Sequence, residues 1–177
     1  KNLILINAKN NFGKGSALKE GVKKATKQWI LTSDIDFSVP IDEIINWIQK
    51  GYLNKKTNVF FGSRAHSDSI VNSKFYRKVV GNFLRIIISY LLDINIKDTQ
   101  CGYKLYEKKI AQYIFSNMHS NGFEHDIEII LILKKKGIFI EELPVNWTHV
   151  SLSKVNIFSD SFKVLKSVFF LKNKYLN

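Results

Sequence analysis

Apolar and polar residues alternate along the chain with two periods, one typical of buried strands and one typical of amphipathic helices. Short, almost continuously apolar runs that end at turn residues predict buried strands. They occur at residues 3–6, 29–33 and 59–62, and an extended segment around Pro144 covers residues 138–147. Apolar residues spaced three or four positions apart predict helices at residues 17–25, 41–49, 73–92, 107–118 and 125–136, and from residue 158 onward. Strands that alternate with helices predict an α/β fold, with a mostly parallel sheet flanked by helices.

Two of these elements carry expectations about burial. The run from Leu3 to Ile6 is expected to be a buried strand, and the helix at 41–49 is expected to turn Ile44, Ile45 and Ile48 inward. The pattern also lacks the strands that open such a sheet. Because the sequence starts at Lys1 rather than at a methionine, we expect a domain that is truncated at its N-terminus.

Composition limits the classes of function. The 177 residues are enough for one domain with a real core, and 45% hydrophobic with 13% aromatic residues argues against disorder. A formal net charge of +12 favours anionic partners such as phosphates, nucleic acid or an acidic membrane surface. Cys101 is the single cysteine, which excludes an internal disulfide framework and a cysteine-based zinc site. No apolar run approaches the ~20 residues that a membrane span needs.

The first candidate site is the acidic pair Asp34-Ile35-Asp36, directly after the strand at 29–33. Ligands of α/β sheets bind at the carboxyl ends of strands, and carboxylate oxygens suit Mg²⁺ or Mn²⁺ that bridges a diphosphate. Acids are also common in turns and helix caps, so the pair alone leaves both interpretations open.

A glycine-rich segment precedes the first helix. Asn10, Gly13, Lys14 and Gly15 place glycines and a base before free helix amides, an arrangement that favours a bound phosphate. The segment is not a Walker A loop, because Gly15 follows Lys14 where that motif needs Ser or Thr. A plain glycine turn into a surface helix is the alternative.

Two further loops contain candidate chemistry. Arg64 follows the strand at 59–62 and could grip a phosphate with two hydrogen bonds, whereas His66 is a metal ligand or a structural residue. In the loop that starts at Asp98, this acid is the better candidate for chemistry, and Cys101 is expected to serve packing. Asp126 belongs to an acidic group at a helix start, where a structural role is equally well supported.

The segments 73–92 and 156–177 are amphipathic, with phenylalanines bordered by basic residues. Such stripes pack into a core or lie in a membrane interface, where each cation near an anionic leaflet adds ~1 kcal/mol. Both alternatives stay open.

Together these segments resemble the family 2 glycosyltransferases of the GT-A fold, and more narrowly the dolichyl-phosphate β-glucosyltransferases. The likeness spans nearly the whole chain. It rests on the segments 10–17, 34–36, 62–66 and 98–106, together with 126–128, 144–147 and 153–155. The resemblance implies a single catalytic domain over residues 1–177 that transfers a hexose, glucose from UDP-glucose, with inversion onto a polyprenyl phosphate at the cytoplasmic face of a membrane. That membrane would be the cytoplasmic membrane in a bacterium and the endoplasmic reticulum in a eukaryote, with undecaprenyl or dolichyl phosphate as the lipid. The strand and acidic turn with which the family holds uracil and ribose are not found in this sequence.

The resemblance also implies roles for particular residues. Asp34 and Asp36 would bind Mg²⁺ or Mn²⁺, and the loop from Asn10 to Gly15 would hold the donor diphosphate. Asp98 would orient the sugar or act as a weak base. The other expected roles are the acceptor phosphate for Arg64, Arg77 and Lys154, and support of the site for Gln100 and Asp126.

Alternatives remain within and outside the family. A related transferase would use GDP-mannose or extend a glycan. A basic module that binds nucleic acid would show steep salt dependence, but the acids at positions 34, 36, 98 and 126 fit it poorly, and we expect no nucleic-acid partner.

Overall fold

The computed structural model describes residues 3–54, 57–72, 85–149 and 157–176. The helices are α1 (Lys14–Lys24), α2 (Glu43–Gln49), η1 (Tyr52–Asn54), α4 (Lys108–Asn117), α5 (His125–Lys135) and α6 (Ile157–Leu176), and residues 85–92 are also helical. The strands are β1 (Trp29–Thr32), β2 (Val59–Ser63), β3 (Ile70–Asn72), β4 (Lys104–Glu107), β5 (Glu141–Pro144) and β6 (Asn146–Thr148). The alternation of strands and helices expected from the sequence is confirmed.

The central sheet has the order β1-β4-β2-β5. Strands β1, β2 and β5 run in the same direction, as a parallel sheet requires, but β4 is antiparallel to both of its neighbours. Three of the four strands thus share one direction, which confirms the expected mostly parallel sheet, and β4 is the exception. The reason lies in the preceding loop, which ends at the edge where β1 and β2 finish, so that β4 must run back through the sheet from that edge.

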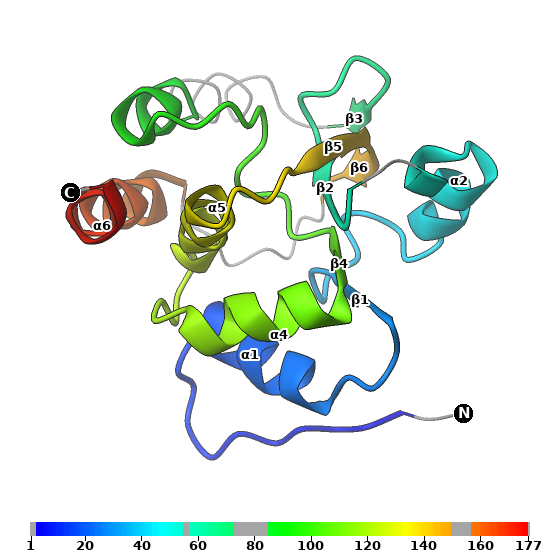
Figure 1. The fold of residues 1–177 in the computed structure, drawn as a ribbon, viewed down its shortest axis with the longest axis horizontal. Coiled ribbons are helices and arrows are strands. Elements are labelled where there is room, and N and C mark those ends of the chain that lie inside the picture. The colour runs from blue at the N-terminus through cyan, green and yellow to red at the C-terminus, as the bar shows by residue number, and fades with distance from the viewer. Residues whose placement is uncertain (1–2, 55–56, 73–84, 150–156, 177) are drawn as a thin grey trace.

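The two faces of this sheet carry separate cores, because successive strand residues point to opposite faces. Phe61 and Tyr106 face a large core that α1, α4, α5 and α6 complete, whereas Phe60 and Leu105 face a smaller core around Trp47 of α2. Figure 1 shows this layering: α1 and α4 lie together below the sheet, α5 and α6 lie to its left, and α2 lies to its right.

A small second sheet lies next to β2 and β5. Strand β3 pairs in parallel with β6, and Ser69 fixes the pair to the central sheet. Its hydroxyl donates to the Ser63 carbonyl at 2.6 Å and accepts from the Val145 backbone N–H at 2.9 Å. The loop that follows β2 is thereby held in place.

The expected strand at residues 3–6 does not form. Leu3 is 93% exposed and Leu5 is 89% exposed, and none of the described strand pairs includes this segment. An apolar run becomes a strand when a neighbouring edge satisfies its backbone N–H and C=O groups. Among the described residues, no edge pairs with this run.

The inward face of α2 also differs from the expectation. Ile45 and Ile48 are 47% and 59% exposed, and Ile44 is partly buried. Trp47 and Glu43 face inward instead. The Trp47 indole N–H donates to the Pro144 carbonyl at 2.8 Å, and Glu43 accepts from the side chain of Asn146 at 3.0 Å, so specific polar contacts decide the face.

The described parts of the two amphipathic segments contribute to the large core, whereas residues 73–84, 156 and 177 of these segments lie outside the described residues. Ile88 and Leu92 from one, and Val168 and Leu171 from the other, are almost fully buried within it. The same helices expose Ile86, Tyr90, Phe169 and Phe170. Within the described part of the chain, no helix combines the length and the apolar character needed to cross a membrane.

Glu128 of α5 anchors the end of α6. Its carboxylate is fully buried and accepts hydrogen bonds from the Ser120 backbone N–H at 2.6 Å, the Tyr175 hydroxyl at 2.7 Å and the Lys174 ammonium at 3.1 Å. Burial would raise the pKa of Glu128, but these hydrogen bonds outweigh it and lower the pKa to about 2.

We predict that Glu128→Gln lowers the free energy of unfolding at pH 7 by about 2–3 kcal/mol, because the Lys174 ammonium, the Tyr175 hydroxyl and the Ser120 backbone N–H lose a buried, charged acceptor. Since the folded-state pKa lies below the ordinary value of 4.5, this contribution is present above about pH 5 and disappears as the pH falls toward 2. Urea unfolding of both proteins across this pH range measures the difference. Glu20→Gln, in an exposed pair on α1, is the matched control and should change stability little. A difference that does not depend on pH would contradict the prediction.

Candidate active site

The candidate residues meet at the edge where β1 and β2 end. Asp34 follows β1, Arg64 follows β2, and the loop from Asp98 to Tyr103 leads into β4 at the same edge. Thr32 at the end of β1 lies opposite Lys104 at the start of β4. The reversal of β4 therefore brings this loop against both acidic and basic candidates.

Asp34 lies between a lysine and a glycine. The Lys14 ammonium is 2.6 Å from Asp34 Oδ1, and the two side chains are 24% and 38% exposed. A Cβ atom on Gly102 would lie 2.6 Å from the Asp34 carboxyl carbon, so no larger residue fits without moving the carboxylate. Burial would lower the pKa of Lys14, but nearby Asp126 and Asp34 outweigh it and raise the pKa.

Asp36 is oriented by Ser38. Its Oδ1 accepts from the Ser38 backbone N–H at 3.0 Å and from the Ser38 hydroxyl at 2.8 Å. Phe37 between them has a φ of 51°, in the left-handed region that side chains other than Gly, Asn and Asp rarely adopt. Asp36 is exposed, and none of the described residues donates a hydrogen bond to its second oxygen.

The donor set of this site suits a hard divalent cation. The Lys14 ammonium already shows that a cation is accommodated at Asp34. Among the described residues, no group of three or more His, Cys, Asp or Glu could hold a metal. The candidate ligands are the two carboxylates of Asp34 and Asp36. Mg²⁺ is commonly bound through one or two carboxylates together with substrate phosphates and water, and the residues present fit that arrangement.

Arg64 and Asp98 form the second part of the site. Arg64 donates to Asp98 through Nε at 2.7 Å, through Nη2 at 2.8 Å and through its backbone N–H at 2.9 Å, and the Gln100 backbone N–H adds a fourth bond at 3.2 Å. Each Asp98 oxygen thus accepts twice, which fills the four lone-pair positions of a carboxylate. Burial would raise the pKa of Asp98, but the Arg64 charge and these bonds lower it to about 2. The geometry favours an orienting role for Asp98 over a role as a base.

The Arg64 guanidinium also lies over the Trp147 ring, 5.7 Å from its centroid. Burial would lower the pKa of Arg64, but Asp98 raises it further above its already high value. Arg64 is consequently a permanent cation in a fixed orientation.

Behind Asp34 lies a buried ion pair that the sequence did not identify. Lys104, which is 1% exposed, pairs with Asp126 at the start of α5, and His125 Nε2 is 3.3 Å from the same carboxylate. Burial would raise the pKa of Asp126, but Lys104, His125 and Lys14 lower it. The available signal was a lysine directly before the apolar pair Leu105 and Tyr106.

Gly13, directly before α1, and Gly15, in its first turn, both pack closely against neighbouring residues. Gly13 has a φ of 105°, and a Cβ there would collide with the Asn121 carbonyl. A Cβ on Gly15 would lie 2.9 Å from His125 Cβ. Asn10 is exposed and forms no hydrogen bond with another described residue. No side chain caps the first turn of α1.

Other candidates lie apart from this chemistry. His66 accepts from the Asp68 backbone N–H at 3.1 Å and belongs to a turn. Cys101 is buried, and burial raises the pKa of its thiol to about 12, in keeping with a packing role. Arg77 and Lys154 fall outside the described residues.

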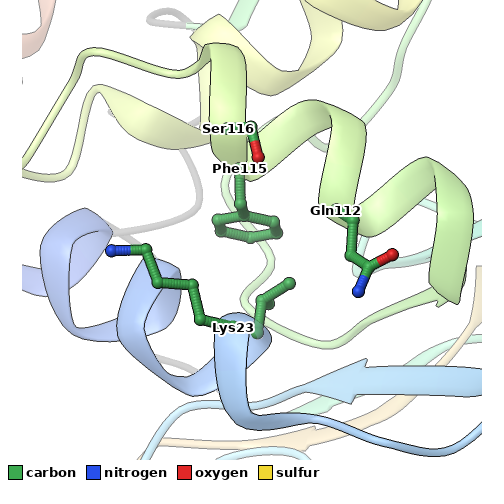
Figure 2. A pocket seen from close by; sticks show the side chains of 5 residues that line it. Lys23, Gln112, Phe115 and Ser116 are labelled. Atoms are coloured by element: carbon green, nitrogen blue, oxygen red, sulfur yellow. The ribbon is translucent and has the colours of Figure 1, made fainter.

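A pocket between α1 and α4 contains none of the candidate residues. Figure 2 shows it lined by Val22, Lys23, Gln112, Phe115 and Ser116. With one exposed lysine and no acid, it offers no convergent set of catalytic groups.

We predict that Gly102→Ala displaces the Asp34 carboxylate, because the new methyl group overlaps it, and weakens at least about 10-fold the Mn²⁺-dependent UDP binding that the family resemblance implies. Isothermal titration calorimetry measures the binding. Gly21→Ala is the control, since a Cβ there meets nothing within 4 Å. Equal UDP affinity in both variants would refute this account of Gly102.

The chain is similar to known proteins in both sequence and fold. Residues 1–115 match the family model described as glycosyl transferase family 2. The dolichyl-phosphate β-glucosyltransferase of Dictyostelium discoideum is 32% identical and aligns with 99% of this chain and 55% of its own length. The human protein of the same name is 28% identical, over 97% of this chain and 55% of its own. The chain thus spans about half the length of these curated relatives.

Solved structures share the fold. Glucosyl-3-phosphoglycerate synthase from Mycobacterium tuberculosis in complex with Mn²⁺ and UDP-glucose superposes with a TM-score of 0.64 at 13% identity, over 90% of this chain and 54% of that one. The same enzyme with Mg²⁺ and UDP gives a TM-score of 0.60 at 12% identity, over 90% and 54%. Since the family model matches well over half of the sequence and the architecture agrees with that resemblance, the chain belongs to glycosyl transferase family 2.

Proposed function

We propose that the protein transfers glucose from UDP-glucose to a polyprenyl phosphate of the dolichyl type, with inversion at the anomeric carbon. Support comes from the curated relatives, which are named dolichyl-phosphate β-glucosyltransferases. The observation that carries the proposal is that one loop holds both parts of the site. Asp98 of this loop fixes Arg64, and Gly102 of the same loop packs against Asp34.

The donor would bind at Asp34 and Asp36. These carboxylates would hold Mg²⁺ or Mn²⁺, and the bound ion supplies a positive charge that offsets the charge on the departing diphosphate. Lys14 and the uncapped start of α1 add a second positive region for the same phosphates.

The acceptor would bind at Arg64, with Arg77 and Lys154 as further proposed contacts. A phosphate monoester has its second pKa near 6, so at pH 7 its oxygen attacks without losing a proton. A bond forms between that oxygen and the anomeric carbon as the bond from this carbon to the UDP β-phosphate oxygen breaks. In-line displacement turns an α-linked donor into a β-linked product.

This chemistry needs no strong general base, which agrees with the saturated carboxylate of Asp98. Asp98 would hold Arg64 and orient the sugar, with Gln100 beside it. Asp126 would support the site from behind through Lys104. Two anionic substrates repel each other, so fixed cations lower the barrier by offsetting this repulsion.

We further propose that the protein works at the cytoplasmic face of a membrane as a single catalytic domain. Phe169 and Phe170 of α6 are 57% and 69% exposed, with the exposed Lys166 nearby on the helix. Ile86 and Tyr90 are likewise exposed. Aromatic and basic side chains of this kind suit the interface region where a lipid phosphate is presented.

We predict that Asp36→Asn lowers glucose transfer by about 10²-fold or more, because one of the two metal-binding carboxylates is lost. The assay follows radiolabelled glucose from UDP-glucose into lipid-extractable product with polyprenyl phosphate as acceptor. Asp42→Asn, an exposed acid before α2, is the control and should retain activity. Full activity of Asp36→Asn would refute the metal assignment, and label that enters lipid from GDP-mannose instead would favour the mannosyl alternative.

A further inference from the structure

We infer that Lys14 is an internal counter-ion that occupies Asp34 until the donor arrives, and that it then transfers to the donor diphosphate as the divalent cation takes its place. This inference rests on the proposed function and deepens it, since it describes how the same site selects a metal–nucleotide complex over free metal.

Lys14 occupies the place beside Asp34 where a metal ion would bind. Its ammonium is 2.6 Å from Asp34 Oδ1, and the backbone of Gly102 closes off another side of the same carboxylate. A divalent cation that approaches Asp34 alone therefore meets a positive charge within a few ångströms. The repulsion of these like charges lowers the affinity of free metal.

Lys14 has a second negative charge nearby, that of Asp126. Lys14 is followed by Gly15, which packs against His125, and His125 Nε2 lies 3.3 Å from the buried carboxylate of Asp126. Because Asp126 already contacts Lys104, it attracts Lys14 without binding it directly. The charge of Asp126 would thus keep the Lys14 ammonium close to the site after it leaves Asp34.

The protein offers few ligands to a metal ion at this site. Asp34 and Asp36 provide two carboxylates, and one oxygen of Asp36 is already engaged by Ser38. Within the described residues, no third acid or histidine completes a metal cluster. A diphosphate would supply the missing oxygen ligands and at the same time accept Lys14, so metal and donor should bind together.

The test is a titration of the protein with Mn²⁺ in the absence of nucleotide, in which electron paramagnetic resonance measures the free Mn²⁺. The same titration is then repeated in the presence of UDP. In Lys14→Met the side chain becomes one atom shorter, loses its charge and gains no oxygen ligand. We expect this variant to bind Mn²⁺ alone about 10-fold more tightly than the wild type, and UDP to strengthen Mn²⁺ binding less. Lys24→Met, an exposed position on the same helix, should behave as the wild type.

Adding Asp34→Asn to Lys14→Met should abolish the gain in Mn²⁺ affinity. The inference is overturned if Lys14→Met binds Mn²⁺ no more tightly than Lys24→Met, or if the gain survives without the Asp34 carboxylate. In either case UDP-dependent Mn²⁺ binding by the wild type would leave the proposed function intact. If the wild type bound no Mn²⁺ even with UDP, the proposed function would fail as well.

Discussion

The site depends on the direction of β4, which enters the central sheet at the edge where β1 and β2 end. Because β4 must start at that edge, the loop before it crosses both strand ends. This path puts Asp98 against Arg64, Gly102 against Asp34, and Lys104 opposite the last residue of β1. A change in the backbone of this loop would therefore disturb the surroundings of Asp34 and of Arg64 together.

Charge is arranged in pairs at the site although the chain as a whole carries +12. Lys14 with Asp34, Arg64 with Asp98, and Lys104 with Asp126 each combine one cation with one carboxylate. Buried pairs of this kind are weak evidence for stability, because desolvation offsets their attraction. Their value here is geometric, since they fix cations in the orientation that the proposed donor and acceptor phosphates need.

Much of this arrangement could be predicted from the sequence. Asp34, Asp36 and Arg64 follow apolar runs, and strand ends of an α/β sheet lie at one edge, so local pattern was sufficient. The role of Gly102 and the pairing of Lys104 with Asp126 could not be predicted, because they depend on the reversed strand and on contacts between residues far apart in the sequence. Ile45 and Ile48 show the same limit, since the polar contacts of Trp47 and Glu43 decide which face of α2 is buried. The apolar run from Leu3 to Ile6 predicted a strand, but a strand also needs a neighbouring strand whose backbone groups pair with its own.

The central claim is metal-dependent transfer with inversion, and the product of the wild-type protein tests it most directly. Incubation with Mn²⁺, UDP-glucose and polyprenyl phosphate should yield a glucosyl lipid whose anomeric proton shows the large coupling constant of a β linkage by NMR. EDTA should abolish its formation, and added Mn²⁺ should restore it. An α-linked product, or transfer that persists in EDTA, would contradict the account.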